Sequence, residues 1–333
     1  MNPSGPQPIG TAFTRHAGVD YPILCGAMYP CSNPELVAAV SAAGGLGIVQ
    51  PISLTYVHGR DFRAGLREIR SLTSKPIGLN ALVERSLKRY EQRMHEWVDI
   101  ALEEGVRFFV TALGNPRWVV DAVHSGGGVV YHDVTERRWA ERALQEGVDG
   151  LICVNRRAGG HAGSRTAADL FAELTDLKVP LVLAGGVGDE QQFAQALALG
   201  YEGVQMGTRF IATRECAVHA DYQAAIVEAN EEDIVLTDKL SGVPCSVIHT
   251  PMIAKLGLRA GPISNWLLRQ RRTKHWMRTL YAVRSLRRLK RSSQQGLGYR
   301  DVFQAGKSAG AVHTVEAAGD IVRLFAAAVQ PRH

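Results

Sequence analysis

The sequence predicts an α/β fold in which eight parallel strands close into a (β/α)8 TIM-like barrel. Between residues 22 and 210, short apolar runs alternate with longer amphipathic runs, and the apolar runs have no polar face. Strands that are apolar on both faces and joined by crossover helices indicate a parallel sheet covered by helices. Eight such units in series favour a closed barrel over an open doubly wound sheet, although the strand count alone leaves both open.

The apolar runs are the expected strands, and the amphipathic runs between them are the expected helices. Several of these helical patterns end in glycine directly before the next strand, which is a common C-terminal signal of helices. Examples of the helical runs are NPELVAAVSAAGG, YEQRMHEWVDIALEEG, TERRWAERALQEG and DEQQFAQALALG. The expected strands occupy 22–28, 47–51, 76–82, 107–113, 129–134, 150–155, 180–186 and 203–210.

The alternation stops after residue 237. An irregular stretch comes next, then a basic helical one, LLRQRRTKHWMRTLYAVRSLRRLKRSS, and finally a helical pattern within 312–329. We therefore expect a barrel domain over 1–237, a basic helical excursion over 238–305 that covers the barrel mouth, and a C-terminal helix over 306–333 that returns to the barrel.

The positive charge of the chain is concentrated in this excursion. The 333 residues carry a net charge of +6. Between Asp238 and Asp301 there are 14 Lys or Arg and no acidic residue, which leaves 24 basic against 32 acidic residues elsewhere. Within 269–291 the basic residues are interleaved with apolar ones, which leaves two interpretations. The stretch is either a solvated face packed on the barrel or a surface that binds an acyl carrier, coenzyme A or an anionic membrane. No known nucleic-acid motif accompanies the charge, so we expect no nucleic-acid partner.

Composition points to an ordinary soluble globular protein of a reducing compartment. The apolar fraction of 46% is typical of globular proteins, and there is no apolar run of about 18 residues or more. The N-terminus lacks the apolar core of a signal peptide. Five scattered cysteines without a CxxC pair argue against a disulfide framework and against a zinc site. We therefore expect a cytoplasmic location and no metal.

Two glycine-rich turns follow the seventh and eighth expected strands, at AGGVGD (184–189) and MGTRF (206–210). In (β/α)8 barrels these two loops commonly form a phosphate site from backbone N–H groups. Gly185 and Gly186 allow the chain to approach an anion closely, while Gly207 and Thr208 add N–H groups and a hydroxyl. The pair of turns predicts a phosphate-bearing cofactor.

Two histidines lie at the ends of expected strands. His161 follows the sixth strand within RRAGGHAG, where three glycines permit a close backbone approach to a bound molecule. Its side chain titrates near neutral pH, so it is the candidate catalytic residue. His132 ends the fifth strand in VVYHDV and is expected to line the cofactor pocket. Asp133 beside it is expected to cap the following helix.

Several motifs resemble the nitronate monooxygenase family, formerly called 2-nitropropane dioxygenases, over about residues 10 to 230. They are PILCGAM, AAVSAAGGLGIV, GLNAL, AGGHAG, LVLAGGVGD and GVQMGTRFIATREC, in the family's order. The family is itself similar to the flavin-dependent enoyl-acyl-carrier-protein reductases. The resemblance implies a TIM-like barrel that holds FMN non-covalently.

The resemblance also implies roles for individual residues. His161 matches the catalytic histidine of members that oxidise nitronates. The positions that match flavin contacts and phosphate loops are Ala27, Met28, Asn80, Gly160, Gly185, Gly186, Gly207 and Thr208. The sequence departs from the family at Cys25, where many relatives have glutamine, and at Arg157, where they have an acidic residue. Two arginines beside the reacting region suit an anionic substrate.

The first functional hypothesis is FMN-dependent oxidation of alkyl nitronates by molecular oxygen to a carbonyl compound and nitrite. In it, His161 stabilises the anion or removes an α-proton. The alternatives are flavin-dependent reduction or α,β-dehydrogenation of a fatty acyl thioester or fatty acid, and an NAD(P)H:quinone reductase. A flavin-binding protein without activity is a fourth hypothesis, against which the presence of His161 counts.

Overall fold

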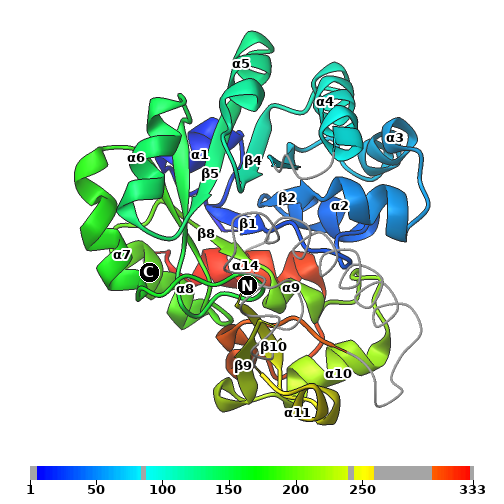
Figure 1. The fold of residues 1–333 in the computed structure, drawn as a ribbon, viewed down its shortest axis with the longest axis vertical. Helices are drawn as coiled ribbons and strands as arrows, with labels where there is room; N and C mark the ends of the chain where they lie inside the picture. Colours follow the sequence, from blue (N-terminus) through cyan, green and yellow to red (C-terminus); the bar gives the residue numbers. More distant parts are fainter. Residues whose placement is uncertain (1–5, 84–87, 239–243, 259–301, 331–333) are drawn as a thin grey trace.

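The computed structural model describes residues 6–83, 88–238, 244–258 and 302–330, and it contains a closed barrel of eight parallel strands (Figure 1). Each strand pairs with the next one along the chain, and the barrel closes where the eighth strand pairs with the first. The expected barrel and its eight strands are confirmed. The strands are β1 (Ile23–Cys25), β2 (Leu46–Val49), β3 (Ile77–Leu82), β4 (Phe108–Ala112), β5 (Val129–Val134), β6 (Gly150–Val154), β7 (Leu181–Ala184) and β8 (Gly203–Met206).

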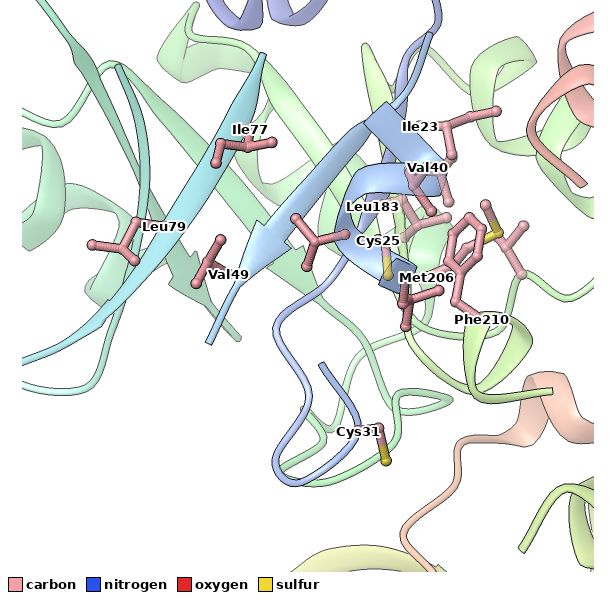
Figure 2. Close-up of a cluster of buried hydrophobic side chains, with 14 of the residues drawn as sticks. Ile23, Cys25, Cys31, Val40, Val49, Ile77, Leu79, Leu183, Met206 and Phe210 are labelled. Atoms are coloured by element: carbon pink, nitrogen blue, oxygen red, sulfur yellow. The ribbon is translucent and has the colours of Figure 1, made fainter. Parts of the chain in front are cut away.

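Alternate residues of each strand point into the barrel and out toward the helices. The inward side chains, such as Leu24 and Ile48, form a cluster that fills the barrel. The outward side chains form a larger cluster between the strands and the helices. Figure 2 shows part of this outer cluster, with Ile23, Leu79 and Met206. The strands are apolar on both faces because both faces are buried.

The helices that follow the strands cover the outside of the barrel (Figure 1). Three of them begin at capping side chains, because Asp61, Thr166 and Asp189 each accept a hydrogen bond from the backbone N–H three residues later. The covering elements are α2 (Pro34–Ala42), a π-helical turn (Ser53–Val57), α3 (Phe62–Leu72), α4 (Lys88–Glu103), α5 (Arg117–Ser125), α6 (Arg137–Gln145), α7 (Ala167–Leu174), a 3-10 turn (Thr175–Leu177) and α8 (Glu190–Ala198).

Helix α1 (Ala12–Ala17) closes the N-terminal end of the barrel. Its Phe13 is fully buried and makes edge-to-face contacts with Phe108 and Tyr131, at ring-centroid distances of 5.6 Å and 6.0 Å. His16 Nδ1 lies 3.1 Å from the Tyr131 hydroxyl. Because this end is plugged by aromatic side chains, a ligand site belongs at the opposite end, where the strands have their carboxyl termini.

A small two-stranded sheet follows the barrel. Strands β9 (Ile234–Thr237) and β10 (Cys245–Ile248) are antiparallel and lie with α11 on one side of the molecule (Figure 1). The stretch after 237 was expected to be irregular, but it contains β10 and α11 (Pro251–Leu256). An isolated apolar run of four residues gives too weak a pattern to identify such a strand. The remaining elements are α9 (Thr208–Ile211), α10 (Ala220–Glu228) and 3-10 turns at Glu231–Asp233 and Lys307–Ala311.

The last helix, α14 (Ala318–Ala328), packs against α2 and α8, and its Phe325 ring lies 5.8 Å from that of Phe193. The domain division at 237/238 stays a prediction, although β9 and β10 pair across that boundary. Most of the expected basic excursion, including 269–291, lies outside the described residues.

The described ranges contain all five cysteines of the chain. All five cysteines are buried with free thiols. No helix in these ranges is both long enough and apolar enough to cross a membrane.

We expect Phe13→Ala to destabilise the protein by about 3–5 kcal/mol, since it removes a fully buried ring that contacts two other aromatic side chains. Leu324→Ala on the exposed side of α14 is the control and should change stability by no more than about 0.5 kcal/mol. Chemical denaturation of both variants measures the difference. Equal unfolding midpoints would contradict the assignment of Phe13 as the plug of the barrel.

Candidate active site at the barrel mouth

The register of the strands decides which side chains reach the barrel mouth. In a barrel of this kind, alternate strands contribute one inward side chain each to a layer. From the pairing of the eight strands, the uppermost layer of the odd-numbered strands consists of Gly26, Asn80, Asp133 and Ala184. Gln205 of β8 lies just below, because a Cβ added to Gly26 would be 2.9 Å from its Cγ. The apolar interior therefore ends in a polar layer.

The loops after β7 and β8 carry the glycines that are expected to form an anion site. Gly185 and Gly186 have φ values of 105° and 83°, which L side chains rarely adopt. Gly207 is the N-cap of α9, and a Cβ added there would lie 3.3 Å from the sulfur of Met28. The strand-one segment and the strand-eight loop, both expected to contact the cofactor, therefore meet at the mouth.

Thr208 is buried beside these loops. Its Oγ1 accepts a hydrogen bond from the backbone N–H of Gly306 at 2.9 Å. A Cβ added to Gly188 would lie 2.4 Å from the carbonyl oxygen of Ser308. The chain that returns to the barrel after the excursion thus packs against the strand-seven and strand-eight loops. The hydroxyl hydrogen of Thr208 is still available for donation, because its bond to Gly306 uses only an oxygen lone pair.

The other expected cofactor contacts lie in or next to the mouth. Ala27 packs against the inward cluster and Met28 against the outer one, and both are partly exposed. Asn80 is buried in the upper layer, and its Nδ2 donates to the carbonyl oxygen of Val110 at 3.4 Å. The structure brings these residues together with the glycine loops. Cys25, in contrast, faces outward into the cluster between strands and helices (Figure 2).

His132 is on the other side of its strand. It pairs with Leu151, which belongs to the outer cluster, and its Nδ1 lies 2.8 Å from Oγ1 of Thr111. Burial lowers the pKa of His132 to about 4, so the ring is neutral at physiological pH. This corrects the expectation that His132 lines the cofactor pocket, because the alternation of the strand turns it toward the helices.

Asp133 takes the inward position instead. It does not cap the next helix, because the N-cap of α6 is Glu136 and the backbone N–H of Arg137 in the first turn donates to Oε1 of Glu173 at 2.9 Å. Asp133 Oδ1 is enclosed and has no hydrogen-bond partner among the described residues. Burial raises the pKa of this carboxyl to about 7. The sequence singled out Asp133 for a structural role, whereas the fold places it at the mouth.

His161 lies in the loop between β6 and α7 and is exposed. Neighbouring Gly160 has a φ of 66°, and its carbonyl oxygen accepts a hydrogen bond from the N–H of Ser246 in β10 at 2.8 Å. At Gly159, an added Cβ would lie 2.8 Å from the backbone nitrogen of Gly306. The loop that holds His161 is therefore fixed on two sides by segments that follow the barrel.

The two arginines before His161 differ in their surroundings. Arg156 is exposed. Arg157 is half-buried and forms a two-pronged ion pair with Glu231, with N–O distances of 2.6 Å and 2.8 Å. Lys307 Nζ lies 3.5 Å from the same carboxylate. Because Glu231 carries one negative charge against the positive charges of Arg157 and Lys307, this cluster keeps one net positive charge beside the exposed Arg156.

Sequence reasoning missed three residues of this region: Gln205, Glu231 and Gly306. Glu231 follows Arg157 by 74 positions, and no local pattern signals such a pairing. Gln205 is the polar residue of an otherwise apolar strand, and this was the signal available in the sequence. Within the described ranges, no three His, Cys, Asp or Glu side chains gather as a metal site would require.

Known proteins resemble this chain in both sequence and fold. The sequence model of the family described as nitronate monooxygenase matches residues 11–323. The chain is 30% identical over 247 residues to the "(3aS,4S,5R,7aS)-5-hydroxy-7a-methyl-1-oxo-octahydro-1H-indene-4-carboxyl-CoA dehydrogenase" of Rhodococcus jostii, which covers 74% of this chain and 67% of that protein. It is 28% identical over 290 residues to a probable nitronate monooxygenase of Staphylococcus saprophyticus, which covers 74% and 81% of the two chains.

Two solved structures extend the comparison. FabK from Thermotoga maritima has a TM-score of 0.78 and 29% identity over 96% of each chain. The nitroalkane oxidase of Streptomyces ansochromogenes has a TM-score of 0.76 and 21% identity, over 96% of this chain and 98% of that one, and this likeness supports the fold.

We expect His132→Asn to make the protein less sensitive to acid. The folded pKa is near 4 and that of an exposed histidine is about 6.5, so the unfolded chain binds the proton more readily between these values. Wild-type protein therefore loses stability as pH falls from about 6.5 to 4, by up to about 1.4 kcal/mol per pH unit from this group. Denaturation of wild type and variant at several pH values measures it, with exposed His95→Asn as control. Parallel pH profiles of wild type and His132→Asn would contradict the buried neutral ring.

Proposed function

Because the chain belongs to the nitronate monooxygenase family, we propose that it is an FMN-dependent oxidoreductase acting on the α,β carbon–carbon bond of an acyl thioester. Membership of this family and the neighbouring structures make it a flavin-type oxidoreductase. The choice of FMN and of an acyl substrate is the proposal, and it is supported by the residues of the mouth.

The mouth fits a flavin mononucleotide. The loops at Gly185 and Gly186 and at Gly207 would hold the phosphate through their backbone N–H groups, with Gly207 at the N-cap of α9. Asn80 and Asp133 offer polar atoms to a ring system above the barrel, and Oδ1 of Asp133 has no other partner among the described residues. When bound, the flavin supplies hydride transfer to or from the substrate.

The substrate class rests on one observation, which is where the basic segment joins the fold. The 14 Lys and Arg of this acid-free segment lie between Asp238 and Asp301. Ser246, near the beginning of this segment, donates its N–H to the carbonyl oxygen of Gly160 at 2.8 Å. Lys307, shortly after the end of the segment, donates its N–H to the carbonyl oxygen of Arg157 at 2.9 Å. The described residues at both ends of the segment therefore meet the loop of His161. The phosphates of coenzyme A, or the acidic surface of an acyl carrier, would be attracted to this side of the mouth.

The relatives agree with this choice. The 30% identical protein of Rhodococcus jostii is named as a dehydrogenase of a carboxyl-CoA compound, and FabK matches over nearly its whole length. In the proposed reaction, His161 removes the proton from the α-carbon during dehydrogenation or returns it during reduction. The backbone hydrogen bond at Gly160 fixes the loop next to His161, and the exposed position of His161 would let it exchange protons with solvent.

Nitronate oxidation is the second candidate. It is favoured by the 28% identical probable nitronate monooxygenase and by the match of His161 to the catalytic histidine of such enzymes. A small nitronate needs only the mouth, with molecular oxygen as the oxidant, and would make no use of the basic segment. Quinone reduction with NAD(P)H stays a further outcome of a substrate test.

We expect Gly207→Val to lower the affinity for FMN strongly while the protein stays folded. The φ of Gly207 is −112°, which valine adopts, but its side chain would project beside Met28 into the phosphate loops. Equilibrium titration of flavin-free protein with FMN measures the affinity. Gly10→Val is the control, because a Cβ there has no neighbour within 4 Å. Wild-type affinity in Gly207→Val would show that the phosphate lies elsewhere.

We expect His161→Gln to keep FMN and to lose about 10²–10⁴-fold in turnover of acyl-CoA or acyl-carrier substrates, as is typical for loss of a general acid or base. Steady-state assays with enoyl and saturated acyl thioesters, a small nitronate, and NAD(P)H with quinone measure it. His95→Gln is the control and should keep wild-type turnover. In the wild type, the thioester rates should fall as salt rises, because exposed charges are screened. Salt-independent turnover of the nitronate alone would favour the second candidate over the first.

A further inference from the structure

Asp133 is an acidic side chain at the mouth for which the fold gives no structural purpose. It pairs with Ile152, a member of the inward cluster, so it points into the barrel. The register places it in the same layer as Asn80, one of the residues that match a flavin contact. The residue as a whole is partly exposed, while its Oδ1 is enclosed. Asp133 therefore borders the mouth with one oxygen held in the protein.

A buried acceptor without a partner is costly, and such groups in native proteins call for an explanation. Asp133 makes no helix cap, no ion pair and no hydrogen bond from Oδ1 within the described ranges. It belongs to no metal cluster there either. A structural reason would require one of these contacts. A ligand that meets the carboxyl at the mouth would supply such a partner.

The groups around Asp133 do not fix its charge. On β3 and β4 the neighbouring positions are the amide of Asn80 and Ala112, which carry no charge. On β6 the nearest titratable group is Cys153, whose thiol stays protonated because burial, and then the charge of Asp133, raise its pKa. On its own strand, His132 faces the helices and is neutral. In the loop after β6, Arg157 is paired with Glu231, and His161 is exposed.

With no fixed partner, the carboxyl can gain or lose a proton close to neutral pH, since burial raises its pKa to about 7. A negative charge that develops nearby would raise this pKa further, because like charges in a site of low polarity repel each other. Two-electron reduction of a flavin places such a charge on its ring. A carboxylate in contact with the ring would oppose reduction, whereas a neutral carboxyl would not.

We propose that Asp133 contacts the flavin ring from the floor of the mouth and takes up one proton from solvent when the flavin is reduced. With flavin bound, its two electrons would come as hydride from a saturated acyl thioester or from NAD(P)H, and the Asp133 carboxylate would become a carboxylic acid by forming one O–H bond with a proton from solvent. When the flavin is reoxidised, the same proton returns to solvent. This role goes beyond the choice of substrate, and it rests on the flavin lying over the barrel mouth.

The test is the reduction potential of the bound flavin between pH 5.5 and 9, measured with a chemical reductant in wild type and in Asp133→Asn. Below the pKa of Asp133 the carboxyl is protonated in both redox states, so the reduction potential should change with pH equally in the two proteins. Above about pH 7 the wild-type potential should fall more steeply with pH, by the amount that corresponds to one additional proton per two electrons. The potential of the variant should show no such steepening. Asp121→Asn, an exposed aspartate of α5, is the matched control and should behave as wild type.

A second measurement covers the case in which Asp133→Asn retains too little flavin. Proton uptake on reduction of wild type at pH 8, followed with an indicator dye, should be one proton larger than the flavin alone accounts for. An infrared difference spectrum with labelled aspartate should show a carboxylic acid forming on reduction. Parallel potential curves in both proteins, or no carboxylic acid band, would overturn the role of Asp133. Protein that binds no flavin at all would instead refute the proposed cofactor site together with this role.

Discussion

The pairing of β8 with β1 is the constraint on which the rest of the structure depends. It closes the barrel at the register Leu24 to Gln205 and Cys25 to Met206. Once the barrel is closed, each strand residue has a fixed side, because alternation allows no intermediate choice. A shift of one residue would turn Asp133 toward the helices and His132 into the mouth. The chemical character of the mouth is thus set by the register and only indirectly by the local sequence.

This explains why the sequence predicted the strands but not the sides on which their residues lie. Eight apolar runs between amphipathic helices were enough to predict the barrel, because only a parallel sheet buries both faces of so many strands. Because both faces of these strands are apolar, the sequence does not show which face points into the barrel. In VVYHDV the two polar residues are adjacent, so they lie on opposite faces and give no preference. His132 was therefore placed in the mouth, while the fold puts Asp133 there. The turn at Gly185 and Gly186 was easier to predict, because two successive glycines are a local signal for a backbone with positive φ.

Charge at the mouth was the second feature that the sequence left incomplete. Counting Arg156 and Arg157 beside His161 suggested a positive pocket. Glu231, which is distant in sequence, balances Arg157. A planar guanidinium held by both carboxylate oxygens has little freedom to turn toward a substrate. The positive charges left to attract an anionic substrate are those of the exposed Arg156 and of Lys307, whose Nζ lies 3.5 Å from the same carboxylate. This favours a ligand whose negative charge lies away from the reacting carbon, as in an acyl thioester of coenzyme A.

The segment 304–311 links the two halves of the proposed site. Its Gly306 N–H donates to Thr208 in the phosphate loop, and the same residue lies so close to Gly159 that neither position has room for a side chain. Lys307 N–H donates to the carbonyl oxygen of Arg157 in the loop of His161. A cofactor phosphate that orders the loops at Thr208 would therefore also order the backbone next to His161. Since these contacts join the loop of Thr208 to the loop of His161 through one short stretch of chain, a flavin phosphate bound at Thr208, as proposed, would be physically coupled to the placement of the histidine.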